Sequence, residues 1–252
     1  MQQDDASPAR PHRGIYLLPN AFTTAALFSG FFAIVQAMNL RFDTAAIAIF
    51  CSMVLDSLDG RVARMTKTQS DFGAEYDSLA DMVSFGAAPA LVIYEWSLRG
   101  LGKWGWVAAF VYVAGAALRL ARFNTNLAVV DKRFFQGLPS PASAALVAGF
   151  VWVFEDLRYV GSDLAWPSWL ITVYAGLSMV SNSPFVSGKA LNRRSVPFIV
   201  VVLIMLVFVA VSSDPPKWLF AMFVAYGLSG HLLWFWHRVR RGRNPATAQA
   251  GE

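Results

Sequence analysis

Four aspartates stand at regular spacing in an otherwise apolar stretch of the chain: Asp56, Asp59, Asp77 and Asp81. Residues three or four positions apart lie on one face of a helix, so each pair can direct its carboxylates the same way. A carboxylate at membrane depth costs at least about 2.5 kcal/mol on insertion scales, and carboxylates that face one another also repel. A cation is therefore expected among them. Ligands that are all oxygen favour a hard divalent ion, Mg²⁺ or Mn²⁺.

The residues between the aspartates indicate what such an ion would act on. Mg²⁺ commonly binds substrate phosphates as well as protein carboxylates. Gly60 would let a phosphate or a base approach the backbone, and Arg64 offers a bidentate donor suited to phosphate. A cation-coupled transporter could also use intramembrane carboxylates, but it would not need Gly60, Gly73 and Arg64 at this fixed spacing. The pattern therefore predicts metal-dependent phosphotransfer, and Asp71, outside the pattern, is expected only to open a helix.

Composition predicts the elements that must position these aspartates. The 252 residues are 56% hydrophobic and only 15% charged, whereas an ordinary soluble domain carries about 25% charged residues. Helices of roughly 17–25 apolar residues are the expected spanning element, because the alternating polarity of barrel strands is absent. We therefore expect an all-α, polytopic transmembrane helix bundle of about eight spans. The candidate spans are 16–38, 43–66, 73–98, 103–126, 140–157, 166–186, 195–212 and 216–238.

The second and third spans carry the aspartates at their adjoining ends. A short turn around Ser70 to Gly73 would make them antiparallel neighbours, so that the four carboxylates converge at one mouth of the bundle. Of the 21 Lys and Arg residues, 16 then lie on that side and five on the other. The positive-inside rule places this mouth and both termini on the cytoplasmic side of the inner membrane, and it accounts for the net charge of +5 without a nucleic-acid partner. The five outside residues are Arg41, Arg99, Lys103, Arg158 and Lys217.

The expected organisation is one transmembrane catalytic domain, 15–240, between cytoplasmic tails at 1–14 and 241–252. From Asp56 to Asp81, the chain resembles the signature of the CDP-alcohol phosphotransferases, D-x2-D-G-x2-A-R-x8-G-x3-D-x3-D. All eight fixed positions of that signature are matched. The resemblance implies an integral membrane enzyme with a six-helix core, often a homodimer, that displaces CMP from a CDP-linked lipid with Mg²⁺ or Mn²⁺, two ions in all.

The resemblance also implies a role for each matching residue. Asp56, Asp59 and Asp77 correspond to metal ligands, and Asp81 corresponds to a residue that serves as both metal neighbour and general base. The residues implied to contact the CDP group are Gly60, Arg64, Ser70 and Gly73 in the signature, with Pro19, Asn20 and Thr23 at the start of the first span.

Two further stretches, Leu118–Asn124 and Phe135–Pro141, resemble the phosphatidylserine synthase branch of this family. Arg119 and Arg122 in the first stretch are three apart at the cytoplasmic end of a span, and arginine can hold a carboxylate bidentately. The resemblance therefore implies transfer of a phosphatidyl group from CDP-diacylglycerol to L-serine, which gives phosphatidylserine and CMP, with both arginines binding serine.

Alternatives to this function stay open from the residues alone. The two arginines would also suit plain anchors of membrane topology. A member of the same family could use another acceptor, such as glycerol 3-phosphate, inositol phosphate or choline. A more distant alternative is a transporter or lipid-binding membrane protein with an inactive site, against which the complete set of aspartates argues.

Overall fold

The computed structural model describes residues 17–66, 70–125, 134–186 and 198–243. The expected N-terminal tail, 1–14, lies outside these residues. The expected C-terminal tail is described only as far as Arg243, where the chain is still helical.

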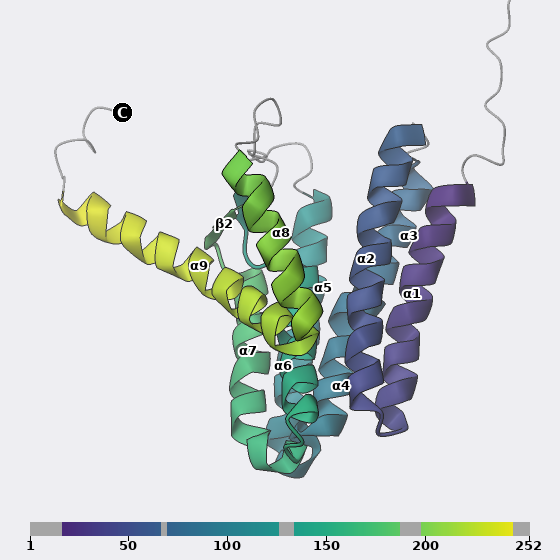
Figure 1. Cartoon of the computed structure of the whole chain (residues 1–252), viewed down its shortest axis with the longest axis vertical. Helices are drawn as coiled ribbons and strands as arrows, with labels where there is room; N and C mark the ends of the chain where they lie inside the picture. Colours follow the sequence, from purple (N-terminus) through teal and green to yellow (C-terminus); the bar gives the residue numbers. More distant parts are fainter. Residues whose placement is uncertain (1–16, 67–69, 126–133, 187–197, 244–252) are drawn as a thin grey trace, which may run out of the picture.

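The described chain is a helix bundle, as expected, and most of its helices run roughly side by side (Figure 1). Two helical stretches, Pro19–Met38 and Lys103–Thr125, are long and apolar enough to cross a membrane, and a shorter apolar stretch covers Val202–Ser213. The helices are α1 (Leu17–Met38), α2 (Phe42–Thr66), α3 (Asp71–Asp81), α4 (Ala88–Trp96), α5 (Lys103–Thr125), α6 (Ser140–Asp156), α7 (Ala165–Val180), α8 (Phe198–Ser213) and α9 (Pro215–Arg243), with short helical turns η2 (Met82–Ala87), η3 (Leu98–Leu101) and η4 (Gly161–Leu164).

The third expected span, 73–98, is not one continuous α-helix. It consists of α3, the π-helical segment η2 and α4, which follow one another directly along the chain. A wider π turn weakens the regular hydrogen-bond ladder and is often found at functional sites. Here the buried Tyr112 of α5 donates its hydroxyl to the Phe85 carbonyl of η2, at 3.0 Å. The π segment begins right after Asp81, and it separates α3, which carries the aspartates, from the apolar α4.

The helix bundle also contains a small β-sheet, which the sequence did not predict. Strand β1 (Phe134–Gln136) pairs antiparallel with β2 (Pro184–Val186), so the sixth expected span, 166–186, ran too far and α7 ends at Val180. Gly137 follows β1 with a φ of +79°, and a side chain there would meet the Met179 carbonyl oxygen at 2.3 Å. Three-residue strands carry too little periodicity to be found from sequence. The sheet ties the start of α6 to the end of α7.

Helix α6, which corresponds to one of the two shortest expected spans, is largely buried among its neighbours. It contacts α2, α4, α7 and α9. Its inward residues are mostly small, such as Ala144, Ala148 and Gly149, and small residues let membrane helices approach closely. The same holds between α5 and α7, where a Cβ on Gly115 would lie 2.4 Å from the Gly176 carbonyl oxygen.

Serine hydroxyls join α1 to its neighbours on the side of the bundle that carries the aspartates. Ser29 of α1 donates to the Ala48 carbonyl of α2, and Ser52 of α2 donates to the Ala26 carbonyl of α1, both at 2.8 Å. Ser84 of η2 donates to the same Ala26 carbonyl, at 3.2 Å. These bonds fix α2 and the segment after α3 against one common helix.

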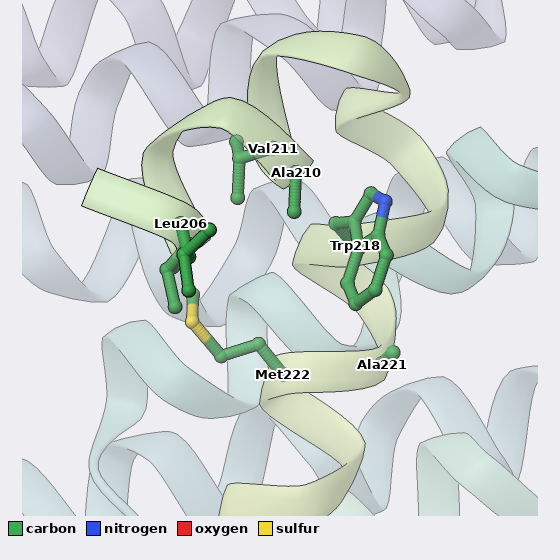
Figure 2. A pocket seen from close by; sticks show the side chains of 7 residues that line it. Leu206, Ala210, Val211, Trp218, Ala221 and Met222 are labelled. Atoms are coloured by element: carbon green, nitrogen blue, oxygen red, sulfur yellow. The ribbon is translucent and has the colours of Figure 1, made fainter. Parts of the chain in front are cut away.

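Helices α8 and α9 form a hairpin at the outside of the bundle, and a groove of about 440 Å³ lies between them (Figure 2). Only apolar and aromatic side chains line it, so it offers no charged group that could hold a phosphate or a carboxylate. The lining residues are Leu206, Val207, Ala210, Val211, Trp218, Ala221 and Met222.

Candidate active site

Polar residues from distant parts of the sequence gather at one end of the bundle. The start of α1, the end of α2 and the end of α5 all lie at the top of Figure 1. Because α3 begins shortly after α2 ends, its first turns lie at the same end. Most of the expected site residues belong to these four helix ends.

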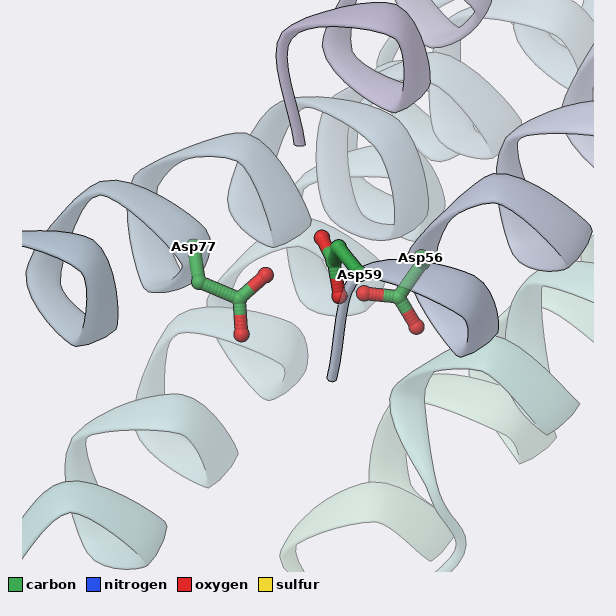
Figure 3. Close-up of side chains that lie close together, drawn as sticks. All are labelled: Asp56, Asp59 and Asp77. Atoms are coloured by element: carbon green, nitrogen blue, oxygen red, sulfur yellow. The ribbon is translucent and has the colours of Figure 1, made fainter. Parts of the chain in front are cut away.

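Three of the four expected aspartates converge. Asp56 and Asp59 of α2 and Asp77 of α3 each offer a carboxylate oxygen, and these oxygens lie within 4.8 Å of one another. Figure 3 shows the carboxylate of Asp77 directed toward those of Asp59 and Asp56 across the space between the two helices. We call these three residues the acidic triad. The expected pairing of the second and third spans through their aspartates is confirmed.

The acidic triad has the properties of a cation site. Asp59 is only 5% exposed, and Oδ1 of Asp77 is buried without a hydrogen-bond partner among the described residues. A buried carboxylate oxygen without a partner is costly. A bound hard divalent ion would supply that partner, since such ions take oxygen ligands from carboxylates. The three residues could therefore hold a metal ion.

Asp81 stands beside the acidic triad, one helical turn after Asp77. Its carboxyl group interacts directly with that of Asp56. Arg119 of α5 is also within electrostatic reach of Asp81. Asp81 therefore has acidic neighbours in the triad and a basic neighbour in Arg119, and it could exchange a proton with a group bound near them.

Thr23 of α1 supports the acidic triad. Its hydroxyl donates to Oδ2 of Asp59 at 2.9 Å, in a buried position one turn after the buried Pro19. The sequence predicted Thr23 and Pro19 as contacts of the CDP group, and the hydrogen bond from Thr23 to a carboxylate of the acidic triad was not foreseen. Hydrogen bonds of this kind orient ligand carboxylates and tune metal affinity.

The other residues expected to contact CDP surround the same helix ends. Asn20 lies next to Gly73, where an added Cβ would be 3.5 Å from the Asn20 Oδ1. Ser70 caps α3 by accepting the Gly73 N–H at 3.0 Å, and Asp71 is the first residue of that helix, as expected. An added Cβ on Gly60 would lie 3.5 Å from the Arg64 guanidinium. Contact of these residues with CDP stays a prediction.

The two arginines of α5 have different surroundings. Arg119 Nη1 donates to the Ser140 hydroxyl at the start of α6, at 3.0 Å, and its Nε is buried without a hydrogen-bond partner among the described residues. Arg122 instead donates to the Asn182 side chain, in the loop before β2, at 3.2 Å. Arg119 therefore binds the start of α6 and lies within electrostatic reach of Asp81, whereas Arg122 binds the loop before β2.

A link between α3 and α5 was not foreseen. Asn124 Nδ2 donates to the Ser78 hydroxyl at 3.0 Å, and Ser78 stands between Asp77 and Asp81 on α3. The bond therefore couples the acidic helix to the helix that carries Arg119. Asn124 lies in a stretch that the sequence analysis singled out, but its partner is 46 positions away and no local pattern identifies it.

Comparison with known proteins identifies the family of this chain. The family model described as CDP-alcohol phosphatidyltransferase matches residues 16–178. A CDP-diacylglycerol–serine O-phosphatidyltransferase of Helicobacter pylori is 37% identical over 200 residues, which cover 79% of this chain and 84% of that protein. The same name is carried by a Mycobacterium tuberculosis protein, 36% identical over 75% of this chain and 67% of its own length, and by a Saccharomyces cerevisiae protein, 37% identical over half of each chain. The chain belongs to the CDP-alcohol phosphatidyltransferase family.

Proposed function

We propose that this protein transfers the phosphatidyl group of CDP-diacylglycerol to L-serine, releasing phosphatidylserine and CMP. The observation that carries the proposal is that Asp81 has both the acidic triad and Arg119 as charged neighbours. The triad suits a metal-bound diphosphate, and the arginine suits the carboxylate of serine. The names of the relatives in bacteria and yeast support the same reaction.

The donor half of the site consists of the acidic triad and the residues around it. Asp56, Asp59 and Asp77 would hold Mg²⁺ or Mn²⁺, and the family resemblance implies two ions. When bound, these ions supply neutralisation of the diphosphate charge and polarisation of its phosphorus. Arg64, beside Gly60, offers its donor fork to the phosphate oxygens that leave with CMP.

The acceptor half of the site, which consists of Arg119 and Asp81, positions the attacking hydroxyl of serine. Arg119 binds the serine carboxylate and holds the serine hydroxyl toward the phosphatidyl phosphorus. Asp81 takes the hydroxyl proton as the new O–P bond forms and the P–O bond to CMP breaks. Asp81 fits this role because Arg119 is within electrostatic reach of its carboxyl group. Since no covalent intermediate is needed, a single displacement accounts for the products.

The two arginines take different parts in this scheme. Arg119 is the direct ligand of serine because it lies beside Asp81 and is partly buried. Arg122, expected as a second ligand, is better placed as a positioning residue, since its guanidinium binds Asn182. Through that contact it holds the loop before β2 close to the acceptor half.

We also propose that the protein is a multi-pass protein of the inner membrane, with the active site and both termini on the cytoplasmic side. The distribution of Lys and Arg residues and the lengths of α1 and α5 support this arrangement. Both CDP-diacylglycerol and membrane lipids would then reach the site from the inner leaflet. The homodimer that the family resemblance implies belongs to the same proposal.

An acceptor panel tests the proposed function. Purified protein is incubated with Mn²⁺, CDP-diacylglycerol and, in separate reactions, L-serine, glycerol 3-phosphate, inositol phosphate or choline, and the lipid product is identified by mass spectrometry. Serine should give phosphatidylserine and an equal amount of CMP. A lipid product formed only from another alcohol would reject serine as acceptor while keeping the reaction of the family.

Replacing the proposed base tests the proton transfer. The Asp81→Asn variant should lose about 10²–10⁴-fold in kcat, because an amide cannot accept the hydroxyl proton. Release of CMP at saturating serine measures this loss. The matched control is Asp71→Asn, which changes an exposed aspartate at the start of the same helix and should keep its turnover. Normal turnover by the Asp81 variant would exclude this residue as the base.

Removing the Thr23 hydroxyl separates its two possible roles. If it supports Asp59, Thr23→Val should raise the Mn²⁺ concentration that gives half-maximal activity by about tenfold, as for other partners of metal ligands. The control is Thr24→Val, whose hydroxyl lies 2.9 Å from that of Tyr76 and not at an aspartate. A Thr23 variant with normal Mn²⁺ dependence but a raised KM for CDP-diacylglycerol would instead favour direct contact with the nucleotide.

A further inference from the structure

Helix α9 lies outside the residues that the family model matches, which end at 178, yet it reaches the acceptor half of the site. Its residue Tyr226 packs against a small hydrophobic cluster of Leu138, Ala142 and Phe185. The centroids of the Tyr226 and Phe185 rings are 5.7 Å apart. The last helix of the bundle thus contacts both the β-sheet and the start of α6.

This cluster surrounds the residue that binds Arg119. Leu138 and Ala142 lie two positions before and two positions after Ser140, whose hydroxyl accepts the Arg119 guanidinium at 3.0 Å. Tyr226 is close enough to Arg119 for the two side chains to interact electrostatically. Residues of α5, α6 and α9 therefore meet near Arg119.

Close packing fixes the part of α9 that carries Tyr226. One residue on, the Gly227 carbonyl accepts the Tyr174 hydroxyl of α7 at 2.9 Å. At Gly230, one turn further, an added Cβ would lie 2.4 Å from the Phe185 ring, so the α9 backbone touches that ring directly. Tyr226 is held beside Arg119 by contacts with α7 and β2.

We propose that Tyr226 is a specificity-determining residue, whose hydroxyl donates to the same acceptor carboxylate that Arg119 binds. This inference rests on the proposed function and adds a role for the last helix. A carboxylate has about four lone-pair sites, so a guanidinium fork and a phenol can bind it together. An acceptor without a carboxylate would gain nothing from either group.

The Tyr226→Phe variant tests this role, because it removes the hydroxyl and keeps the ring that packs on Phe185. The KM for L-serine should rise about tenfold, the usual cost of one hydrogen bond to a charged group, while the KM for CDP-diacylglycerol stays the same. Ethanolamine, which is serine without its carboxylate, is added as a competitor. Each enzyme is assayed at the same ratio of serine concentration to its own KM for serine. The ethanolamine concentration that gives half-inhibition should then be the same for the variant and the wild type. This concentration does not depend on the fraction of enzyme that is folded.

The matched control is Tyr159→Phe, which removes an exposed tyrosine hydroxyl beyond the end of α6 that is opposite to Ser140. Its KM for serine should stay within about twofold of the wild-type value. An unchanged serine KM in Tyr226→Phe, or an equal rise in both variants, would overturn the role of Tyr226. A wild-type protein that forms no phosphatidylserine would instead overturn the proposed function, and this is seen before any variant is made.

Discussion

The rest of the structure depends on the repulsion among carboxylates that the fold holds together. Oxygens of Asp56, Asp59 and Asp77 lie within 4.8 Å of one another. At about 4 Å, two like charges repel by about 4 kcal/mol in the effective dielectric near a protein surface. The hydrogen bond from Thr23 to Asp59 returns about 1.5–3 kcal/mol, which is less than one such pair costs. A bound divalent cation would compensate this repulsion, and the packing of the helices is what brings the three carboxylates together.

That packing extends from the cluster to the chemistry. Helix α1 is joined to α2 and to η2 by serine hydroxyls that donate to backbone carbonyls of the facing helix. The two helices that carry the aspartates therefore cannot move apart without breaking these bonds. The bond between Ser78 and Asn124 joins α3 to α5, and Arg122 donates to Asn182 in the loop before β2. The acidic triad, with a bound divalent ion, would neutralise the diphosphate of the donor, whereas Arg119 would pair with the carboxylate of the acceptor. Asp81 has both sets of charged groups as neighbours.

The sequence was sufficient where the signal is local. Asp56 and Asp59 share one helix face by spacing alone, and the run of apolar residues predicted the helices that carry them, so the acidic triad could be foreseen. The sequence was insufficient where the partner is remote or the element is short. The β-sheet has only three residues in each strand, and the π segment after Asp81 has its contact with Tyr112 on another helix. Tyr226 stands a hundred residues from Arg119 in a stretch that reads only as hydrophobic, and its role depends wholly on tertiary packing.

Anomalous scattering at the manganese edge, from crystals of the full chain grown with Mn²⁺, directly tests whether α2 and α3 together form a divalent-cation site. We expect manganese among the carboxylates of Asp56, Asp59 and Asp77, with Thr23 still bonded to Asp59. Manganese bound only at other side chains, with these three carboxylates turned away from one another, would contradict this expectation.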